Sequence, residues 1–245
     1  MLQLIAFDAD DTLWHTEHLY SDAQARFVSL LAEYHPREWV EQRLYATEMA
    51  NLRYYGYGVK SFLLSMIETA VELSEGRITG REIQQVIDLA KAMLAADVRP
   101  LDHVEETLAR LAETYPLMII TKGDLFDQES KVARSGLANY FKHVEIVSDK
   151  TPAAYAVLLA RQNVAPQQFL MVGNSLRSDV LPVAAIGGHA VHVPYTVTWL
   201  HESVDPAEIN GAAYVQLEHI GELVDVVLRL NSEGSLRGIA EPDEG

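Results

Sequence analysis

The chain has 245 residues, of which 49% are hydrophobic, enough for one large domain or for a core with an inserted second unit. A formal net charge of −16 argues against binding to nucleic acid or to an anionic membrane surface, because both would repel this protein. The absence of cysteine excludes disulfides, thiolate zinc sites and a cysteine nucleophile, and it is compatible with the cytoplasmic location that we expect.

The first predicted element is a buried strand at residues 2–7, a short and nearly continuous apolar run. Because the chain enters this strand at once and contains no run of about 18 apolar residues, we expect neither a secretion signal nor a membrane span. The strand is followed directly by Asp8-Ala9-Asp10-Asp11-Thr12. Acidic side chains this close together favour a bound cation, so the pattern predicts a metal site at the carboxyl edge of a sheet. The alternative is a solvated turn that ends the strand.

The next part of the chain, residues 15–98, predicts helices only. One helix opens with Thr79-Gly80-Arg81-Glu82, a capping-box pattern in which the Thr and Glu side chains bind otherwise unpaired amides. The expected helices lie around residues 20–31, 36–55 and 60–74, and from residue 79 onwards.

Helices and strands alternate after Pro100, which predicts a parallel, doubly wound sheet. The strands are expected at residues 117–120, 144–147, 169–172 and 190–193, each after a helix. We therefore expect an α/β fold, with a Rossmann-like core at residues 1–14 and 99–230 and a helical unit at residues 15–98 inserted after the first strand. Residues 231–245 are expected to form a flexible tail, and Tyr195, Trp199 and His201 to pack the loop after the last strand.

Polar residues follow three of the later strands. They are Thr121-Lys122-Gly123, Ser148-Asp149-Lys150 and the segment from Gly173-Asn174 to Asp179. Because parallel strands place their carboxyl ends on one edge of the sheet, we expect these residues to converge beside Asp8 and Asp10. Taken alone, each is also compatible with a turn or a helix cap, and Lys122 competes with Lys150 for the role of the site cation.

Together these segments resemble the motifs of the haloacid dehalogenase-like hydrolases, most of which are phosphatases. The run from Asp8 to Thr12 is similar to the first motif, DxDxT, and the resemblance extends in order over nearly the whole chain. It includes the helical insertion, which corresponds to a C1-type cap. One departure is Thr151-Pro152 after Lys150, where the family often has Pro immediately after the Lys.

The resemblance implies a role for each matching residue. Asp8 would be the nucleophile and Asp10 the general acid and base, with Lys150 as the cation that neutralises both Asp8 and the phosphate. Thr121, with the amides near Lys122 and Gly123, would bind the phosphate.

The resemblance also implies Mg²⁺ as the cofactor. Its ligands would be Asp8, the backbone carbonyl of Asp10, and Asp179. Asn174 stands where the family commonly has an Asp, as in GDSxxxD, so we expect it to support the metal without adding charge.

These expectations describe a Mg²⁺-dependent phosphatase that hydrolyses a small phosphorylated metabolite through an aspartyl-phosphate intermediate. The alternatives are a 2-haloacid dehalogenase, against which Asp10 argues, a phosphonatase or phosphomutase, and a non-catalytic phosphometabolite-binding protein. The sequence does not reveal the substrate or the oligomeric state. It leaves open whether a group of aromatic and cationic residues in the helical insertion faces the site or packs between helices: Arg53, Tyr54, Tyr55, Tyr57 and Lys60.

Overall fold

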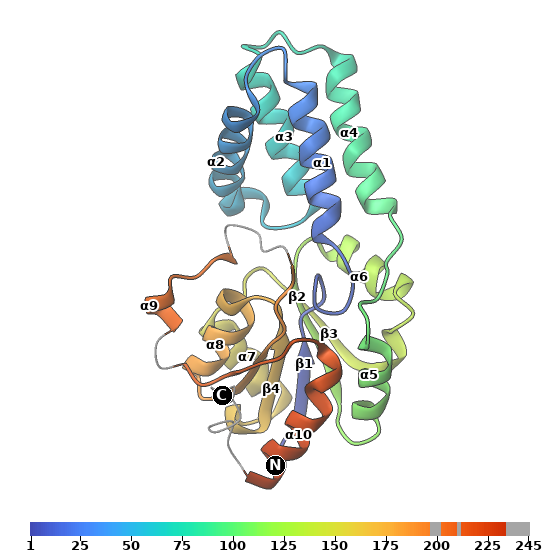
Figure 1. Ribbon diagram of the computed structural model, residues 1–245, viewed down its shortest axis with the longest axis vertical. Helices are drawn as coiled ribbons and strands as arrows, with labels where there is room; N and C mark the ends of the chain where they lie inside the picture. Colours follow the sequence, from blue (N-terminus) through green and yellow to red (C-terminus); the bar gives the residue numbers. More distant parts are fainter. Residues whose placement is uncertain (197–201, 210–211, 234–245) are drawn as a thin grey trace, which may run out of the picture. The chain divides into compact units, whose positions relative to one another are not determined.

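The computed structural model describes residues 1–196, 202–209 and 212–233, so Trp199 and His201 lie outside the described residues. The chain forms two compact units (Figure 1). The core unit comprises residues 1–15, 98–121 and 132 onwards, and the helical unit comprises residues 16–97 together with 122–131. The expected helical unit was residues 15–98, without residues 122–131, and those domain bounds stay a prediction.

The core unit contains, in the described residues, a six-stranded sheet in the order β3-β2-β1-β4-β5-β6. The strands are β1 (Leu4–Phe7), β2 (Leu117–Lys122), β3 (Phe141–Val147), β4 (Phe169–Gly173), β5 (His189–His192) and β6 (Val215–Gln216). β1 pairs in parallel with both β2 and β4, and β4 and β5 continue the parallel arrangement. The predicted α/β fold is confirmed. The two-residue strand β6 was not predicted.

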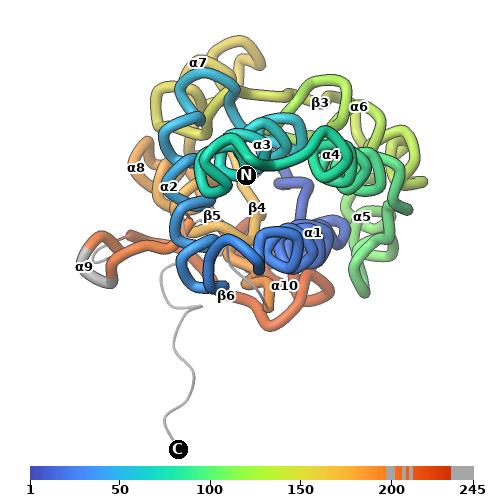
Figure 2. Tube along the Cα trace, turned by 90° about the horizontal axis from the view of Figure 1, so that it is seen from above, coloured from blue at the N-terminus to red at the C-terminus, as the bar shows by residue number. Residues whose placement is uncertain are grey.

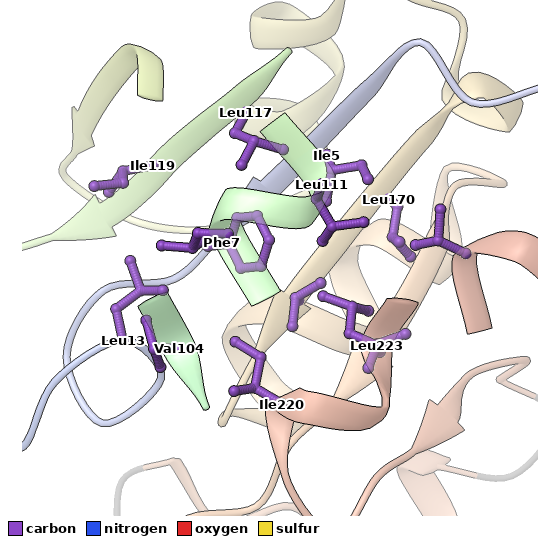
Figure 3. Packing of buried hydrophobic residues seen from close by; sticks show 14 of the residues in the cluster. Ile5, Phe7, Leu13, Val104, Leu111, Leu117, Ile119, Leu170, Ile220 and Leu223 are labelled. Carbon is purple, nitrogen blue, oxygen red and sulfur yellow. The ribbon is translucent and has the colours of Figure 1, made fainter. Parts of the chain in front are cut away.

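Side chains alternate between the two faces of the sheet, and each face has its own apolar cluster. Ile5 and Phe7 of β1 belong to one cluster, and Leu4 and Ala6 to the other. Figure 3 shows the first cluster, where Leu111 of α5 (Val104–Ala112) and Leu223 of α10 (Leu223–Glu233) cover the sheet. The second face is covered by α7 (Pro152–Gln162) and α8 (Leu181–Ala185). Both faces are therefore covered by helices, as in other doubly wound folds.

Helix α10 extends into the segment expected to be a tail. Its last three residues, 231–233, are helical, and Asn231 Oδ1 accepts a hydrogen bond of 3.0 Å from the backbone N–H of Leu2. Its apolar residues recur at helical spacing, so the pattern for this helix was present in the sequence.

The helical unit is built from α1 (Glu17–Leu30), α2 (Arg37–Tyr55), α3 (Val59–Leu73) and α4 (Gly80–Ala95), with the start of α6 (Leu125–Arg134). Neighbouring helices contact one another in the order α1, α2, α3, α4, and α4 contacts α1 again, so α1–α4 form a bundle (Figure 2). The predicted capping box is confirmed, because the Glu82 amide donates to Thr79 Oγ1 and the Thr79 amide donates to Glu82 Oε2. Within the described residues, no helix combines the length and apolarity needed to cross a bilayer.

The chain leaves the core for the helical bundle and returns to it through two segments that run side by side. The His15 amide donates to the Arg99 carbonyl at 3.1 Å, and the Leu101 amide donates to the Leu13 carbonyl at 3.0 Å. Trp14 and Pro100 form an antiparallel bridge between them. These paired connectors lie directly after the acidic loop that follows β1.

Candidate active site

The loop that begins at Asp8 follows β1 and leaves the sheet at the carboxyl ends of its strands. Phe7 pairs with Ile119 on one side and Val172 on the other, and the Asp8 amide donates to the Val172 carbonyl at 2.9 Å. The chain segments that follow β1, β2 and β4 therefore start at one edge of the sheet, as the sequence predicted.

Lys150 lies at the centre of this edge. Its Nζ donates to Asp8 Oδ1 at 2.5 Å and to Asp179 Oδ1 at 2.6 Å, and its side chain is 1% exposed. The backbone is held locally, because Thr151 caps α7 by accepting a hydrogen bond from the Ala154 amide. Lys150 is therefore the cation beside Asp8, and three residues from three separate loops meet as the sequence predicted.

The electrostatics of this cluster leave a surplus of negative charge. Burial raises the pKa of Asp8 to about 7, against the lowering effect of Lys150, and the charges of Asp179 and Asp10 raise it further. Burial alone would lower the pKa of the Lys150 ammonium, but the charges of Asp179 and Asp8 outweigh that effect and hold it above its usual range. One ammonium group balances only one of the two carboxylates that it contacts, so the site favours a further cation.

Thr12 connects the loop after β1 with the loop after β4. Its Oγ1 lies 3.3 Å from Asp8 Oδ2 and 3.2 Å from Asn174 Oδ1, and it accepts a hydrogen bond of 3.0 Å from the Asn174 amide. The Asn174 carbonyl in turn lies 3.0 Å from Nε2 of the buried His192 on β5. These contacts place the side-chain oxygens of Asp8 and Asn174 around one hydroxyl group.

Asp10 has a different environment from Asp8. Its carboxylate is half-buried, and the Trp14 indole Nε1 donates to Asp10 Oδ1 at 2.8 Å. The turn between them requires Asp11 to adopt a left-handed conformation, φ 60°, with its amide bonded to the Trp14 carbonyl. The indole thus holds a second carboxylate two residues from the first, a position suited to proton transfer.

The loop after β4 brings Asp179 back to the strand end through a π-helical turn, Leu176–Val180. Asp179 Oδ2 accepts a hydrogen bond of 3.0 Å from the Ser175 amide. A Cβ atom on Gly173 would lie 2.2 Å from the same oxygen, so only glycine leaves room for this carboxylate. Both Asp179 oxygens therefore accept hydrogen bonds from the chain, one from Ser175 and one from Lys150.

The donor set fits a Mg²⁺ ion that takes few ligands from the protein. Among the residues that the structure describes, no three histidine, aspartate or glutamate side chains cluster as metal ligands. Mg²⁺ needs only one or two carboxylates when water and phosphate oxygens complete its shell. Asp8 and Asn174 provide oxygens around Thr12, whereas Asp179 would have to release one of its two partners to bind a metal directly. Direct ligation by Asp179 stays a prediction.

The last two residues of β2, Thr121 and Lys122, and the following Gly123 are placed differently from one another. Thr121 is buried at the end of the strand in the core unit, whereas Lys122 and Gly123 belong to the helical unit. The Lys122 ammonium lies 4.3 Å from the centre of the Tyr57 ring, and the Lys122 carbonyl accepts a hydrogen bond from Gln128. That these three residues bind phosphate stays a prediction.

The aromatic and cationic residues of the helical insertion contact one another, Asp124 and, through Lys60, the Phe126 ring of α6. Lys60 forms an ion pair of 2.9 Å with Asp124, and Arg53 lies 4.6 Å from the centre of the Tyr54 ring. Tyr54 and Tyr55 are exposed. Part of this group is thus used in packing within the helical unit.

Sequence reasoning missed several contacts of the core site. Trp14 and His192 contact site residues, but a lone Trp or His carries no motif. Tyr195, expected to pack the loop, lies with its hydroxyl 2.8 Å from His15 Nδ1. Glu202, in the segment after β5, accepts hydrogen bonds from the Ser175 and Ser178 hydroxyls. No sequence signal marks Glu202, because its partners are far away along the chain.

A six-stranded parallel core, a helical insertion after its first strand and an Asp–Lys–Asp cluster at its carboxyl edge define a class of hydrolases. A sequence model of the haloacid dehalogenase-like hydrolase family matches residues 2–187, and the chain belongs to that family. A solved haloacid dehalogenase-like hydrolase from Xanthomonas campestris is 39% identical, with a TM-score of 0.84 over 95% of this chain and 93% of that one.

Curated relatives carry a more specific name. A glyceraldehyde 3-phosphate phosphatase from Methanopyrus kandleri is 22% identical over 94% of this chain and 99% of its own length. Another, from Pyrococcus furiosus, is 33% identical over 55% of this chain and 57% of its own length. A HAD-hydrolase from Bacillus subtilis, solved with bound magnesium, has a TM-score of 0.66 at 14% identity, a likeness that extends to the fold alone.

Proposed function

We propose that this hydrolase is a Mg²⁺-dependent phosphatase that hydrolyses a small phosphorylated metabolite through an aspartyl-phosphate intermediate on Asp8. The observation that carries the proposal is the placement of Asp8, buried and bonded to Lys150, with a second, half-buried carboxylate on Asp10 two residues away. The relatives named as glyceraldehyde 3-phosphate phosphatases support a small phosphate ester as the substrate class.

In the first step of this mechanism, an oxygen of the Asp8 carboxylate attacks phosphorus. The bond from phosphorus to the ester oxygen breaks, and Asp10 gives its proton to the departing alcohol. Lys150 stays bonded to Asp8 and faces the negative charge that builds up on the phosphoryl oxygens. Trp14 holds the Asp10 carboxyl during this transfer.

In the second step, water attacks the acyl phosphate and releases inorganic phosphate. Asp10, now ionised, accepts the proton of that water, which restores both carboxyl groups to their starting states. Mg²⁺, held by Asp8, the Asp10 carbonyl and Asp179 with Asn174 in support, would supply positive charge against the phosphoryl oxygens. The helical unit, taken as residues 15–98, would act as a cap that selects the ester.

One experiment tests the proposed function directly. A panel of phosphate esters that includes glyceraldehyde 3-phosphate, and a set of 2-haloacids, are incubated with the wild-type protein, with and without Mg²⁺, and released inorganic phosphate and halide are measured. We expect turnover that requires Mg²⁺. Release of halide from 2-haloacids without any phosphate release would instead identify a dehalogenase, and no turnover of either class would favour a binding protein.

The proton-transfer role of Asp10 predicts a dependence on the leaving group. Asp10→Asn should lower kcat on an alkyl phosphate by about 10²–10⁴-fold, the range of general acid–base catalysis. On p-nitrophenyl phosphate the loss should be smaller, because nitrophenolate leaves without a proton. Steady-state kinetics on both esters provide the measurement, and equal losses on the two would count against this role.

The metal ligands can be separated by two substitutions. Asn174→Asp adds a charge beside Asp8 and should lower the Mg²⁺ concentration for half-maximal activity. Asp179→Asn removes a proposed ligand and the acceptor of two hydrogen bonds, so it should raise that concentration and lower kcat together. A loss of kcat with an unchanged half-maximal Mg²⁺ concentration would show that Asp179 holds Lys150 and does not bind the metal directly.

A further inference from the structure

Glu202, a carboxylate outside the family motifs, is hydrogen-bonded to the turn that carries Asp179. Glu202 lies in the segment that follows β5, and its Oε2 accepts a hydrogen bond of 2.6 Å from Ser178 Oγ. The same oxygen accepts a second hydrogen bond from Ser175 Oγ. One carboxylate oxygen thus joins two hydroxyl groups of the π-helical turn.

Ser175 and Ser178 also form hydrogen bonds within the turn and with the residues packed against it. The Ser178 amide donates to Ser175 Oγ at 3.0 Å, and the Ser178 carbonyl accepts a hydrogen bond of 3.1 Å from the buried Tyr155 hydroxyl. The Ser175 amide holds Asp179 Oδ2, and Asp179 Oδ1 holds Lys150. A continuous series of hydrogen bonds therefore runs from Glu202 through the serines, Asp179 and Lys150 to Asp8.

The negative charge of Glu202 is electrostatically unfavourable at this place unless its hydrogen bonds offset the repulsion. The cluster of Asp8, Asp179 and Lys150 already carries a surplus negative charge, and Glu202 adds another at the same loop. The π-helical turn is also a wide, uncommon conformation that is found mostly at functional sites. Two hydrogen bonds to one carboxylate oxygen offset the cost of its charge and hold this turn in place.

We propose that Glu202 is a positioning residue: by binding Ser175 and Ser178 it fixes Asp179, and through Asp179 it keeps the Lys150 ammonium aligned with Asp8. This inference rests on the proposed phosphatase function. It assigns Glu202 no contact with substrate, so loss of its carboxylate should affect the chemical step and not the binding of the ester.

The test compares two substitutions of Glu202 with a matched control. Glu202→Ala removes the acceptor and should lower kcat on p-nitrophenyl phosphate by about 10–100-fold, as removal of supporting hydrogen bonds around an active site commonly does, with KM changed less than about threefold. Glu202→Gln keeps one acceptor oxygen and should restore kcat to within about threefold of wild type. Glu208→Gln, an exposed glutamate of α9 (Pro206–Ile209), serves as the control and should leave both constants unchanged.

A mutant cycle tests whether Glu202 acts through the serines. The double variant Ser175→Ala/Ser178→Ala should lose as much kcat as Glu202→Ala, and adding Glu202→Ala to it should cause less than about a further twofold loss. Wild-type kcat in Glu202→Ala, or multiplicative losses in the combined variant, would overturn the proposal. If Glu202→Ala does not fold, Ser175→Ala and Ser178→Ala test the same contacts singly, and wild-type kcat in both would also overturn it.

Hydrogen exchange separates this inference from the proposed function. Without substrate or metal, Glu202→Ala should increase amide exchange in residues 174–180, and Glu208→Gln should not. A wild-type protein that hydrolyses no phosphate ester would contradict the proposed function, yet the exchange of this turn would still show whether Glu202 holds it. Unchanged exchange in Glu202→Ala would overturn the positioning role itself.

Discussion

Asp8→Asn is expected to lower kcat on every phosphate ester by at least about 10⁴-fold, because an amide oxygen does not replace a carboxylate as the attacking group. The folded structure should persist. Burial raises the pKa of Asp8 from 3.8 to about 7. Between these two pH values the Asp8 carboxyl is protonated in the folded protein but ionised in the unfolded chain. The free energy of unfolding therefore falls as pH rises from 3.8 to about 7. Asn carries no such titration, so the metal-free variant should be at least as stable as wild type above pH 7.

Two measurements check this expectation: kcat at saturating Mg²⁺, and the thermal midpoint of the metal-free protein at pH 5 and pH 8. Asp225→Asn, at an exposed position on α10 of the same unit, provides the control and should match wild type in kcat. Near-normal turnover in Asp8→Asn would rule out an aspartyl phosphate on this residue.

Lys150→Met should impair both activity and stability. It removes the cation aimed at the phosphoryl oxygens, which should lower kcat by about 10²–10³-fold. It also leaves Asp8 and Asp179 buried beside each other without their shared partner, and breaking a buried pair from one side typically lowers the free energy of unfolding by about 3–5 kcal/mol. Urea unfolding of the metal-free variant and steady-state kinetics provide the two measurements.

The loss of stability in Lys150→Met should depend on pH with a definite sign. Lys150 lowers the pKa of Asp8, so without this cation Asp8 binds a proton more tightly; acidification from pH 8 to pH 5 then neutralises Asp8, and the difference from wild type should shrink. Lys142→Met, at an exposed position of β3, is the control and should match wild type in stability and kcat. Adding Asp179→Asn to Lys150→Met should recover stability but not kcat. A stability loss that grows on acidification would contradict the charge argument.

The order of the core elements could be predicted because it depends on local patterns. Strands β1 and β4 and the first four residues of β2 are uninterrupted apolar runs, and each is followed by polar residues at the same edge. Strand β3 begins at Phe141, earlier than the predicted Val144, and β6 has only two residues and no pattern to recognise. Pairing with neighbouring strands therefore extended or created strands that local sequence did not mark.

The candidate site was predictable only in part, for a similar reason. Asp8, Lys150 and Asp179 lie at fixed offsets from strand ends, so the topology alone brings them together. Whether Asp179 faces a metal or Lys150 depends on hydrogen bonds formed by the turn around it, and sequence offsets do not specify these. Glu202 lies 27 and 24 residues along the chain from Ser175 and Ser178, and no local pattern specifies these contacts.

The two paired segments that connect the core with the helical bundle, residues 13–15 and 99–101, also affect how the protein folds. Central strand β1 pairs with β2 and β4, so its partners are separated from it by the whole helical bundle and more. Contacts between distant residues usually slow folding, because a long flexible loop must close first. The bundle consists of helices in contact with their neighbours, and α4 contacts α1. The two chain segments on either side of the insertion are joined by the hydrogen bonds His15–Arg99 and Leu101–Leu13. Once the bundle has formed, the insertion at residues 16–97 constrains the folding chain as a short loop would, so β1 and β2 meet at little entropic cost.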